Sequence, residues 1–109
     1  MQTIRTARTP GLDAAYLGAS DLAVAHGGQP GIDYFSADAA ARHDTLLEAV
    51  RRKGLKLCLH AHTDEDLRFC IEAGADLVTV ATDALTLHRE AGRLLSEARR
   101  LAARSTPPG

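Results

Sequence analysis

Three short apolar runs alternate with longer amphipathic segments along this chain of 109 residues. The runs cover residues 13–18, 55–60 and 76–81. Such runs, followed by glycine or small polar residues, are typical of strands buried on both faces in a parallel sheet. The segments between and after the runs have apolar residues at helical spacing. The pattern therefore predicts the order β-α-β-α-β-α, in which parallel strands are joined by right-handed crossovers.

The ends of the expected helices have matching signals. Ser36 is a candidate N-cap for a helix that ends at Gly54, which suits the position after the C-cap. Thr63 is a candidate cap for the second helix, whose acidic first turn suits the positive end of the helix dipole. Thr82 and Asp83 begin the last helix, whose apolar stripe has to be covered by some other surface. The stripe consists of Leu87, His88, Ala91, Leu94, Leu95, Ala98, Leu101 and Ala102.

One domain accounts for almost the whole chain. Its length suits a single α/β domain over residues 1–104, with residues 105–109 as a disordered tail. Residues 27–34 are rich in glycine and proline and have no periodic pattern, so they are expected to form a loop.

Composition and charge exclude several classes of partner. The chain is 45% hydrophobic and 25% charged, with a net charge of −1 and few aromatic residues. We therefore expect no binding to nucleic acid or to anionic membranes. Cys58 and Cys70 have neither a redox nor a zinc spacing and are expected to fill the core in a reducing compartment. No apolar run has membrane-spanning length and no signal peptide is evident, which predicts a cytoplasmic location.

Candidate chemical groups lie where the predicted strands end, which is where α/β folds place their sites. Asp21 follows the small residues Gly18, Ala19 and Ser20, and its carboxylate is a hard oxygen ligand for a divalent cation. An alternative is that Asp21 or Ser20 only caps a short helix over residues 22–25.

The histidines have two explanations as well. His60 and His62 form an H-x-H pair at a strand end, a spacing that can bind zinc. The alternative is a solvent-facing loop pair beside the helix cap Thr63. Asp83 is expected to cap a helix rather than bind a metal. The remaining histidines, at positions 26, 43 and 88, are expected to have surface or core roles.

Three segments resemble the HpcH/HpaI aldolase and citrate lyase family. Residues 11–23 (GLDAAYLGASDLA) resemble its sixth strand and the following loop. Residues 54–61 (GLKLCLHA) and 74–83 (GADLVTVATD) resemble the seventh strand and the eighth strand with its entry into the last helix. The resemblance implies a partial (β/α)8 TIM barrel made of the last three β-α units. A complete barrel needs about 250 residues, so the chain would be the C-terminal part of such an enzyme.

The resemblance also implies a chemistry. The metal-dependent members of this family are carbon-carbon lyases (aldolases) that act on 2-keto acids through a pyruvate-type enolate, with Mg²⁺ or Mn²⁺. Asp21 would be one metal ligand, and the backbone amides of Ser20 and Asp21 would help to hold the substrate carboxylate. Ala19 stands where the family usually has proline. The family's other metal-binding glutamate, catalytic histidine and substrate-binding arginine come from strands upstream of this chain. The expectation is therefore that no catalytic residue is present and that activity is weak or absent. Whether this chain alone retains the Mg²⁺ or Mn²⁺ ion is left open.

A second hypothesis is a non-catalytic barrel remnant or oligomerising module. Three open parallel strands leave two exposed edges, and self-association is one way of covering them. A homo-oligomer is expected under either hypothesis. In the family the last helix is commonly exchanged between subunits, and residues 87–102 are the candidate for such an exchange.

Overall fold

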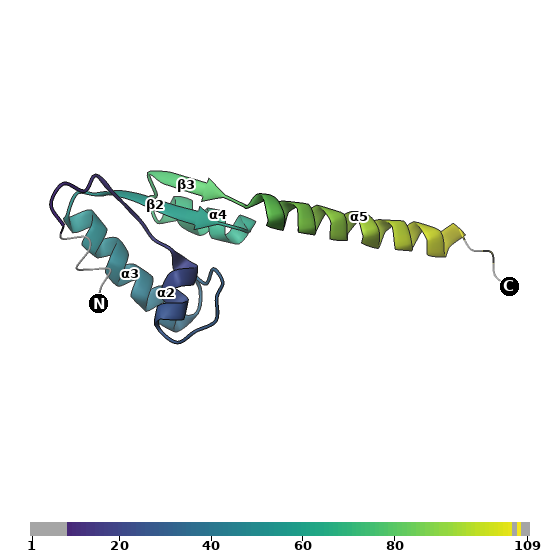
Figure 1. Cartoon of the computed structure of the whole chain (residues 1–109), viewed down its shortest axis with the longest axis horizontal. Coiled ribbons are helices and arrows are strands. Elements are labelled where there is room, and N and C mark those ends of the chain that lie inside the picture. Colours follow the sequence, from purple (N-terminus) through teal and green to yellow (C-terminus); the bar gives the residue numbers. More distant parts are fainter. Residues whose placement is uncertain (1–8, 106, 108–109) are drawn as a thin grey trace.

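The computed structural model describes residues 9–105 and residue 107. In chain order its elements are β1 (Ala14–Tyr16), α2 (Ala19–Ala25), α3 (Ala37–Arg52), β2 (Lys56–Ala61), α4 (Asp64–Glu72), β3 (Leu77–Val80) and α5 (Asp83–Ser105) (Figure 1). The predicted alternation of strands and helices is confirmed, with the additional short helix α2 directly after β1.

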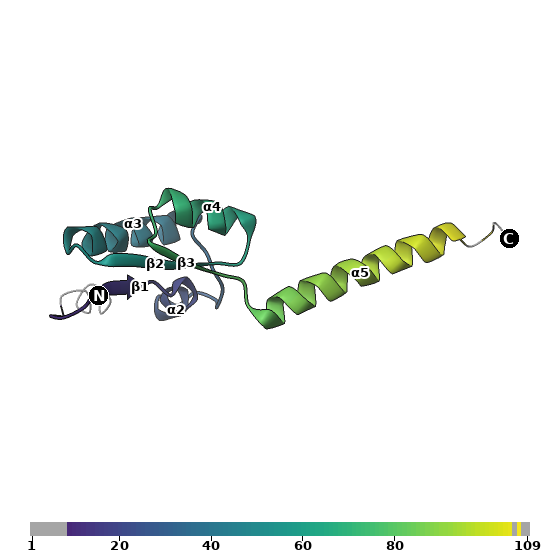
Figure 2. The same cartoon turned by 90° about the horizontal axis from the view of Figure 1, so that it is seen from above.

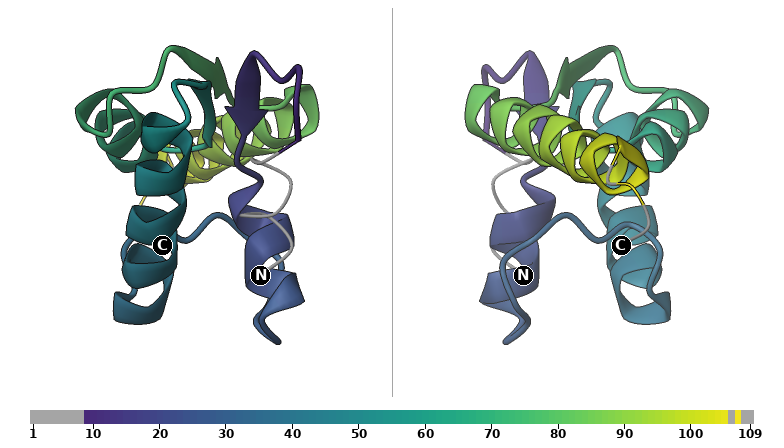
Figure 3. Two further views of the ribbon diagram at one scale, coloured as in Figure 1. Left: turned by 90° about the vertical axis from the view of Figure 1, so that its left-hand side faces the viewer. Right: turned by 90° about the vertical axis from the view of Figure 1, so that its right-hand side faces the viewer.

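The strands form one parallel sheet in the order β1-β2-β3. Ala14 pairs with Lys56, and Cys58 pairs with both Tyr16 and Leu77. In the end-on views, β1 and α2 lie on the opposite side of β2 from α4 (Figure 3). This confirms the predicted α/β class with three parallel strands, in a sheet that does not close into a barrel.

Among residues 9–105, helices cover only one face of the sheet. α3 and α4 both contact β2 and lie on the same side of it (Figure 2). Leu57, Leu59 and Ala61 point to that side and are buried. On the other face, Tyr16 and Leu77 are each 54% exposed. The prediction that these strands are buried on both faces is therefore wrong for this chain, because no described element packs on the second face.

Helix α5 extends away from the sheet as a separate rod (Figures 1 and 2). None of its described residues is buried, and Leu87, Leu94 and Leu95 are 72%, 53% and 52% exposed. The radius of gyration is 19.3 Å, compared with about 13 Å for a compact domain of similar size. The apolar stripe on α5 is thus present, and no residue in the described part of the chain covers it.

The predicted domain (residues 1–104) and tail (residues 105–109) lie only partly within the described residues. α5 ends at Ser105, the first residue of the predicted tail. Residues 1–8 of the predicted domain, and residues 106, 108 and 109 of the tail, lie outside the described part of the chain. Within the described residues, none of the helices is both long and apolar enough to cross a membrane. The cytoplasmic location stays a prediction.

Helix caps account for where α3 and α4 begin. The Ser36 hydroxyl accepts a hydrogen bond from the Ala39 amide at 3.3 Å. Thr63 and Asp66 form a reciprocal capping box, in which each side chain accepts from the other residue's backbone amide. These two predicted caps are confirmed. Asp83 is instead the first helical residue of α5, and the Thr82 hydroxyl accepts from the Leu85 amide at 3.3 Å.

The core includes a tyrosine from the loop between α2 and α3. Tyr34 is 1% exposed, and its ring stacks on Phe69 with centroids 4.5 Å apart. Its hydroxyl donates to the His60 carbonyl at 2.8 Å, and burial raises the pKa of Tyr34. Cys70 is also fully buried, as predicted, whereas Cys58 is half-buried on the bare face of the sheet. The glycine-rich loop is therefore anchored in the core.

His43 on α3 belongs to this core rather than to the surface. It is 3% exposed, and its ring lies 5.0 Å from that of Tyr34, centroid to centroid. Neither ring nitrogen has a hydrogen-bond partner in the described part of the chain. Burial and the nearby Arg42 lower the pKa of His43, and the carboxylates of Asp33 and Asp44 oppose this shift.

We expect acid to destabilise the fold through His43. Because its folded-state pKa lies below the ordinary value of 6.5, the unfolded chain binds more protons as the pH falls through that value. The contribution of neutral His43 to the free energy of unfolding is fully present above pH 6.5 and is lost as the pH falls through the lower folded-state pKa. The free energy of unfolding changes by at most about 1.4 kcal/mol per pH unit through this group. His43→Leu should flatten this slope in urea unfolding at pH 7.5 and 5.5, and His88→Leu on exposed α5 should not. A slope that is the same in His43→Leu as in the wild type would contradict the prediction.

Candidate functional site

The candidate site begins at the turn between β1 and α2. Leu17 is buried below the turn, and Gly18 occupies the N-cap position of α2 without a side-chain hydrogen bond. Asp21 therefore lies in the first helical turn, three residues after the cap. The alternative that Ser20 or Asp21 caps a helix over residues 22–25 is wrong, because α2 begins earlier, at Ala19.

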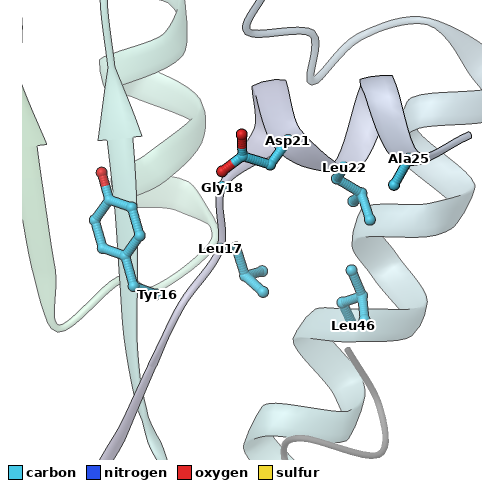
Figure 4. A pocket seen from close by; sticks show the side chains of 7 residues that line it. All are labelled: Tyr16, Leu17, Gly18, Asp21, Leu22, Ala25 and Leu46. Atoms are coloured by element: carbon cyan, nitrogen blue, oxygen red, sulfur yellow. The ribbon is translucent and has the colours of Figure 1, made fainter. Parts of the chain in front are cut away.

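The Asp21 carboxylate lies directly over Gly18. A Cβ atom at Gly18 would be 2.9 Å from Asp21 Oδ2, which is closer than real Cβ contacts allow. Figure 4 shows the carboxylate beside Gly18, with the apolar side chains of Leu17, Leu22 and Leu46 grouped next to it. A pocket at this turn has a volume of about 230 Å³ and is lined by Tyr16, Leu17, Gly18, Asp21, Leu22, Ala25 and Leu46. Glycine at position 18 thus allows Asp21 to present its oxygens at the strand end.

Ser20 has a structural contact that the sequence did not indicate. Its hydroxyl accepts a hydrogen bond from the Gly31 amide at 3.0 Å, which ties the loop before α3 to α2. The backbone amides of Ser20 and Asp21 lie in the first turn of a helix, where amides have no intrahelical acceptor. Because hydrogen bonds within the helix do not use these two amides, they could donate to an anion.

The loop is also ordered by Asp33, which the sequence analysis did not single out. Its carboxylate accepts from the amides of Phe35 and Ser36, each at 3.0 Å, and from the Ser36 hydroxyl at 2.6 Å. These hydrogen bonds lower the pKa of Asp33. An aspartate three residues before a helix cap is a recognisable turn signal. The aromatic residue that follows it, Tyr34, is the core anchor described above.

A second polar group lies on the bare face of the sheet. His60 belongs to β2, so the description of a loop pair is wrong for this residue; His62 follows the strand. His60 Nδ1 is 2.6 Å from the Thr79 hydroxyl, which is 3.0 Å from the Tyr16 hydroxyl. The rings of His60 and His62 are 4.4 Å apart and nearly perpendicular. Register alone brings Tyr16 and Thr79 to His60, because they belong to the neighbouring strands.

The described residues supply an incomplete set of metal ligands at Asp21. Mg²⁺ and Mn²⁺ favour several oxygen ligands. A single carboxylate lines the pocket, and nowhere in residues 9–105 do three histidine, cysteine or acidic side chains gather in a way that could hold an ion. Asp21 fits the role of one hard ligand, and further ligands would have to come from outside the described residues.

Comparison with solved structures identifies the fold. A protein of the HpcH/HpaI aldolase/citrate lyase family from Burkholderia cenocepacia J2315 is 31% identical, with a TM-score of 0.75 over 89% of this chain. The chain resembles part of an HpcH/HpaI aldolase family protein. The resemblance inferred from the three sequence segments is thereby confirmed. The match covers 37% of the Burkholderia chain.

Two further structures share the fold at lower identity. The HpcH/HpaI aldolase from Desulfitobacterium hafniense DCB-2 is 16% identical, with a TM-score of 0.76 over 90% of this chain and 38% of its own. Citrate synthase SbnG is 20% identical, with a TM-score of 0.75 over 93% of this chain and 40% of its own. The chain thus spans about two fifths of the length of these three structures. No family model and no curated protein matches the sequence.

Proposed function

We propose that this chain forms part of a metal-dependent carbon-carbon lyase site of the aldolase type, with Asp21 as a metal ligand. The observation that carries the proposal is the Asp21 carboxylate held over Gly18 at the C-terminal end of β1. This turn lies in a segment that resembles the aldolase family in sequence. A protein of that family also matches 89% of the chain in structure.

The proposed substrate is a 2-keto acid such as pyruvate. A bound Mg²⁺ or Mn²⁺ would supply Lewis acid stabilisation of an enolate. Asp21 would hold the ion, and the first-turn amides of Ser20 and Asp21 would bind the substrate carboxylate, as backbone amides bind anions elsewhere. Gly18 keeps the approach to these amides open. No described residue is proposed to act as the general acid or base.

The second candidate function is that of a non-catalytic remnant or oligomerising module. It is favoured by the exposed apolar residues on α5 and by the site itself, where the described residues supply a single carboxylate. Under both functions we propose a homo-oligomer in which α5 packs on another copy of the chain, through an exchange of this helix between subunits. The two functions differ in whether the strand-end pocket binds a metal ion and a 2-keto acid.

Mn²⁺ binding and pyruvate enolisation test the proposal together. We expect Asp21→Asn to weaken Mn²⁺ binding at least tenfold, because it removes the charged ligand. Binding is measured by the loss of the free Mn²⁺ signal in electron paramagnetic resonance, and enolisation by deuterium exchange into the pyruvate methyl group. Asp83→Asn, at the first residue of α5, is the matched control and should bind as the wild type does. Equal binding by the wild type and Asp21→Asn would refute the ligand role; binding through Asp21 without exchange would favour the remnant.

Gly18→Ala separates the position of the carboxylate from its presence. The added Cβ would displace Asp21 Oδ2, which lies 2.9 Å away. The backbone of Gly18, with φ −84°, suits alanine, and the displaced atom ends a flexible side chain, so we expect unfolding free energy to change by less than about 1 kcal/mol. Mn²⁺ binding should fall as in Asp21→Asn, whereas Gly92→Ala on α5, which meets no neighbour, should leave it unchanged. Full Mn²⁺ affinity in Gly18→Ala would show that the close contact is unimportant.

A further inference from the structure

Apart from Tyr16, which also lines the Asp21 pocket, the hydrogen-bonded group of Tyr16, Thr79 and His60 has no part in the proposed lyase site. It lies on the face of the sheet that no described helix covers, with one residue from each strand. The Thr79 hydroxyl lies within hydrogen-bond distance of both His60 Nδ1 and the Tyr16 hydroxyl, and 3.5 Å from the Leu59 carbonyl. The His60 ring is therefore fixed at one nitrogen by Thr79 of β3, and Thr79 is itself held by Tyr16 of β1.

This arrangement suits a metal-binding imidazole. When Thr79 accepts from His60 Nδ1 and from Tyr16, its own proton is directed to the Leu59 carbonyl and every group is satisfied. The lone pair of His60 is then on Nε2. Metal-binding histidines commonly donate their other ring nitrogen to a neighbouring oxygen in this way, which fixes the tautomer and the ring orientation.

The second imidazole is at a separation that fits shared coordination. The centroids of His60 and His62 are 4.4 Å apart and the rings are at 87°. The expected centroid distance depends on the nitrogen–metal–nitrogen angle. For metal–nitrogen bonds of about 2.1 Å, an angle of about 90° places the two ring centroids about 4.5 Å apart, whereas a tetrahedral angle places them about 5.2 Å apart. The observed spacing is therefore closer to the right angles of Ni²⁺ and Cu²⁺ sites than to tetrahedral zinc.

The surroundings of the pair include one charge of each sign. Asp66 is 6% exposed, and its carboxylate accepts from the amides of His62 and Thr63 at 3.0 Å. The Arg89 guanidinium donates to the His62 carbonyl. Within the described part of the chain, His62 Nε2 is buried and has no hydrogen-bond partner. A buried polar nitrogen of this kind gains from a ligand.

We propose that His60 and His62 bind a divalent transition-metal ion of the nickel and copper class, at a site separate from Asp21. The two imidazole nitrogens supply adjacent coordination positions, and water supplies the others. Thr79 is a positioning residue that holds the His60 ring, and Tyr16 supports Thr79.

Calorimetric titration of the full chain with Ni²⁺ tests the site. His60→Gln and His62→Gln should each weaken binding at least tenfold, and Thr79→Val should weaken it about tenfold by releasing the His60 ring. His88→Gln, on exposed α5, is the matched histidine control and should bind as the wild type does. Asp21→Asn should also leave Ni²⁺ affinity unchanged, so this site and the proposed lyase site are tested separately.

Cu²⁺ supplies a direct structural signal. Electron paramagnetic resonance of the copper-loaded wild type should show nitrogen hyperfine splitting from two imidazoles, reduced to one in His62→Gln. The proposal is overturned if both glutamine variants bind Ni²⁺ as tightly as the wild type, or if the wild type shows no saturable binding up to about 1 mM. Circular dichroism checks folding, and if His60→Gln unfolds, His62→Gln, whose side chain lies outside the strand, decides the outcome.

Discussion

Tyr34→Ala is expected to lower the free energy of unfolding by about 3–5 kcal/mol, the usual cost of removing a buried aromatic ring. The ring is 1% exposed and stacks on Phe69 at 4.5 Å. Its loss would leave a cavity between the loop, α3 and α4. Because native domains have stabilities of only about 5–15 kcal/mol, this one substitution would remove a large part of the total.

The hydroxyl of Tyr34 contributes a smaller, separable part. Tyr34→Phe removes only the hydrogen bond to the His60 carbonyl, and we expect it to cost about 1 kcal/mol. Tyr16→Ala is the matched control, because that ring is 54% exposed and leaves no cavity. Urea unfolding monitored by circular dichroism gives the three values. If Tyr34→Ala cost no more than Tyr16→Ala, the loop would not be anchored in the way that the structure indicates.

Placing charges on the apolar stripe of α5 is expected to convert the proposed oligomer into monomers. Leu94 and Leu95 are more than half exposed in the single chain. Burying two leucine side chains per subunit contributes about 3–6 kcal/mol to association. Replacing both with aspartate would remove this contribution and add a desolvation cost. We expect the mass measured by light scattering to fall to that of one chain, 11.6 kDa.

A control with the same added charge lies on the other side of the helix. Thr86→Asp combined with Ser96→Asp alters exposed polar positions of α5 outside the stripe. This variant should keep the mass of the wild type. The helical signal should also fall in the Leu94 and Leu95 variant, because an isolated helix gains most of its stability from packing. A monomeric wild type at micromolar concentration would contradict the proposed association.

Local signals were sufficient to predict most of the helix ends. The hydroxyls of Ser36 and Thr63 satisfy backbone amides within three residues along the chain. Gly54 follows α3 with φ +67°, a conformation that favours glycine. Such interactions depend on neighbours in sequence and so are visible in the sequence. Asp21 was also singled out from its small neighbours, although only the structure shows that its carboxylate lies over Gly18.

Contacts between distant residues could not be predicted in the same way. The hydroxyls of Tyr16 and Thr79 are 63 residues apart in sequence and meet only because both strands pair with β2 in a particular register. Tyr34 lies in a loop without periodicity, so no pattern distinguished it from a surface residue. Its burial depends on the space between α3 and α4 and on a carbonyl of β2.

The sequence by itself determined the order of strands and helices, the caps and the resemblance to an aldolase family, because periodicity and short motifs act over a few residues. Tertiary structure decided which face of the sheet is covered and which residues meet across the strands. The apolar runs are compatible with burial on both faces, yet burial requires a covering element, and the described helices pack on only one face. For the same reason the apolar stripe of α5 predicts a partner surface without locating it within this chain.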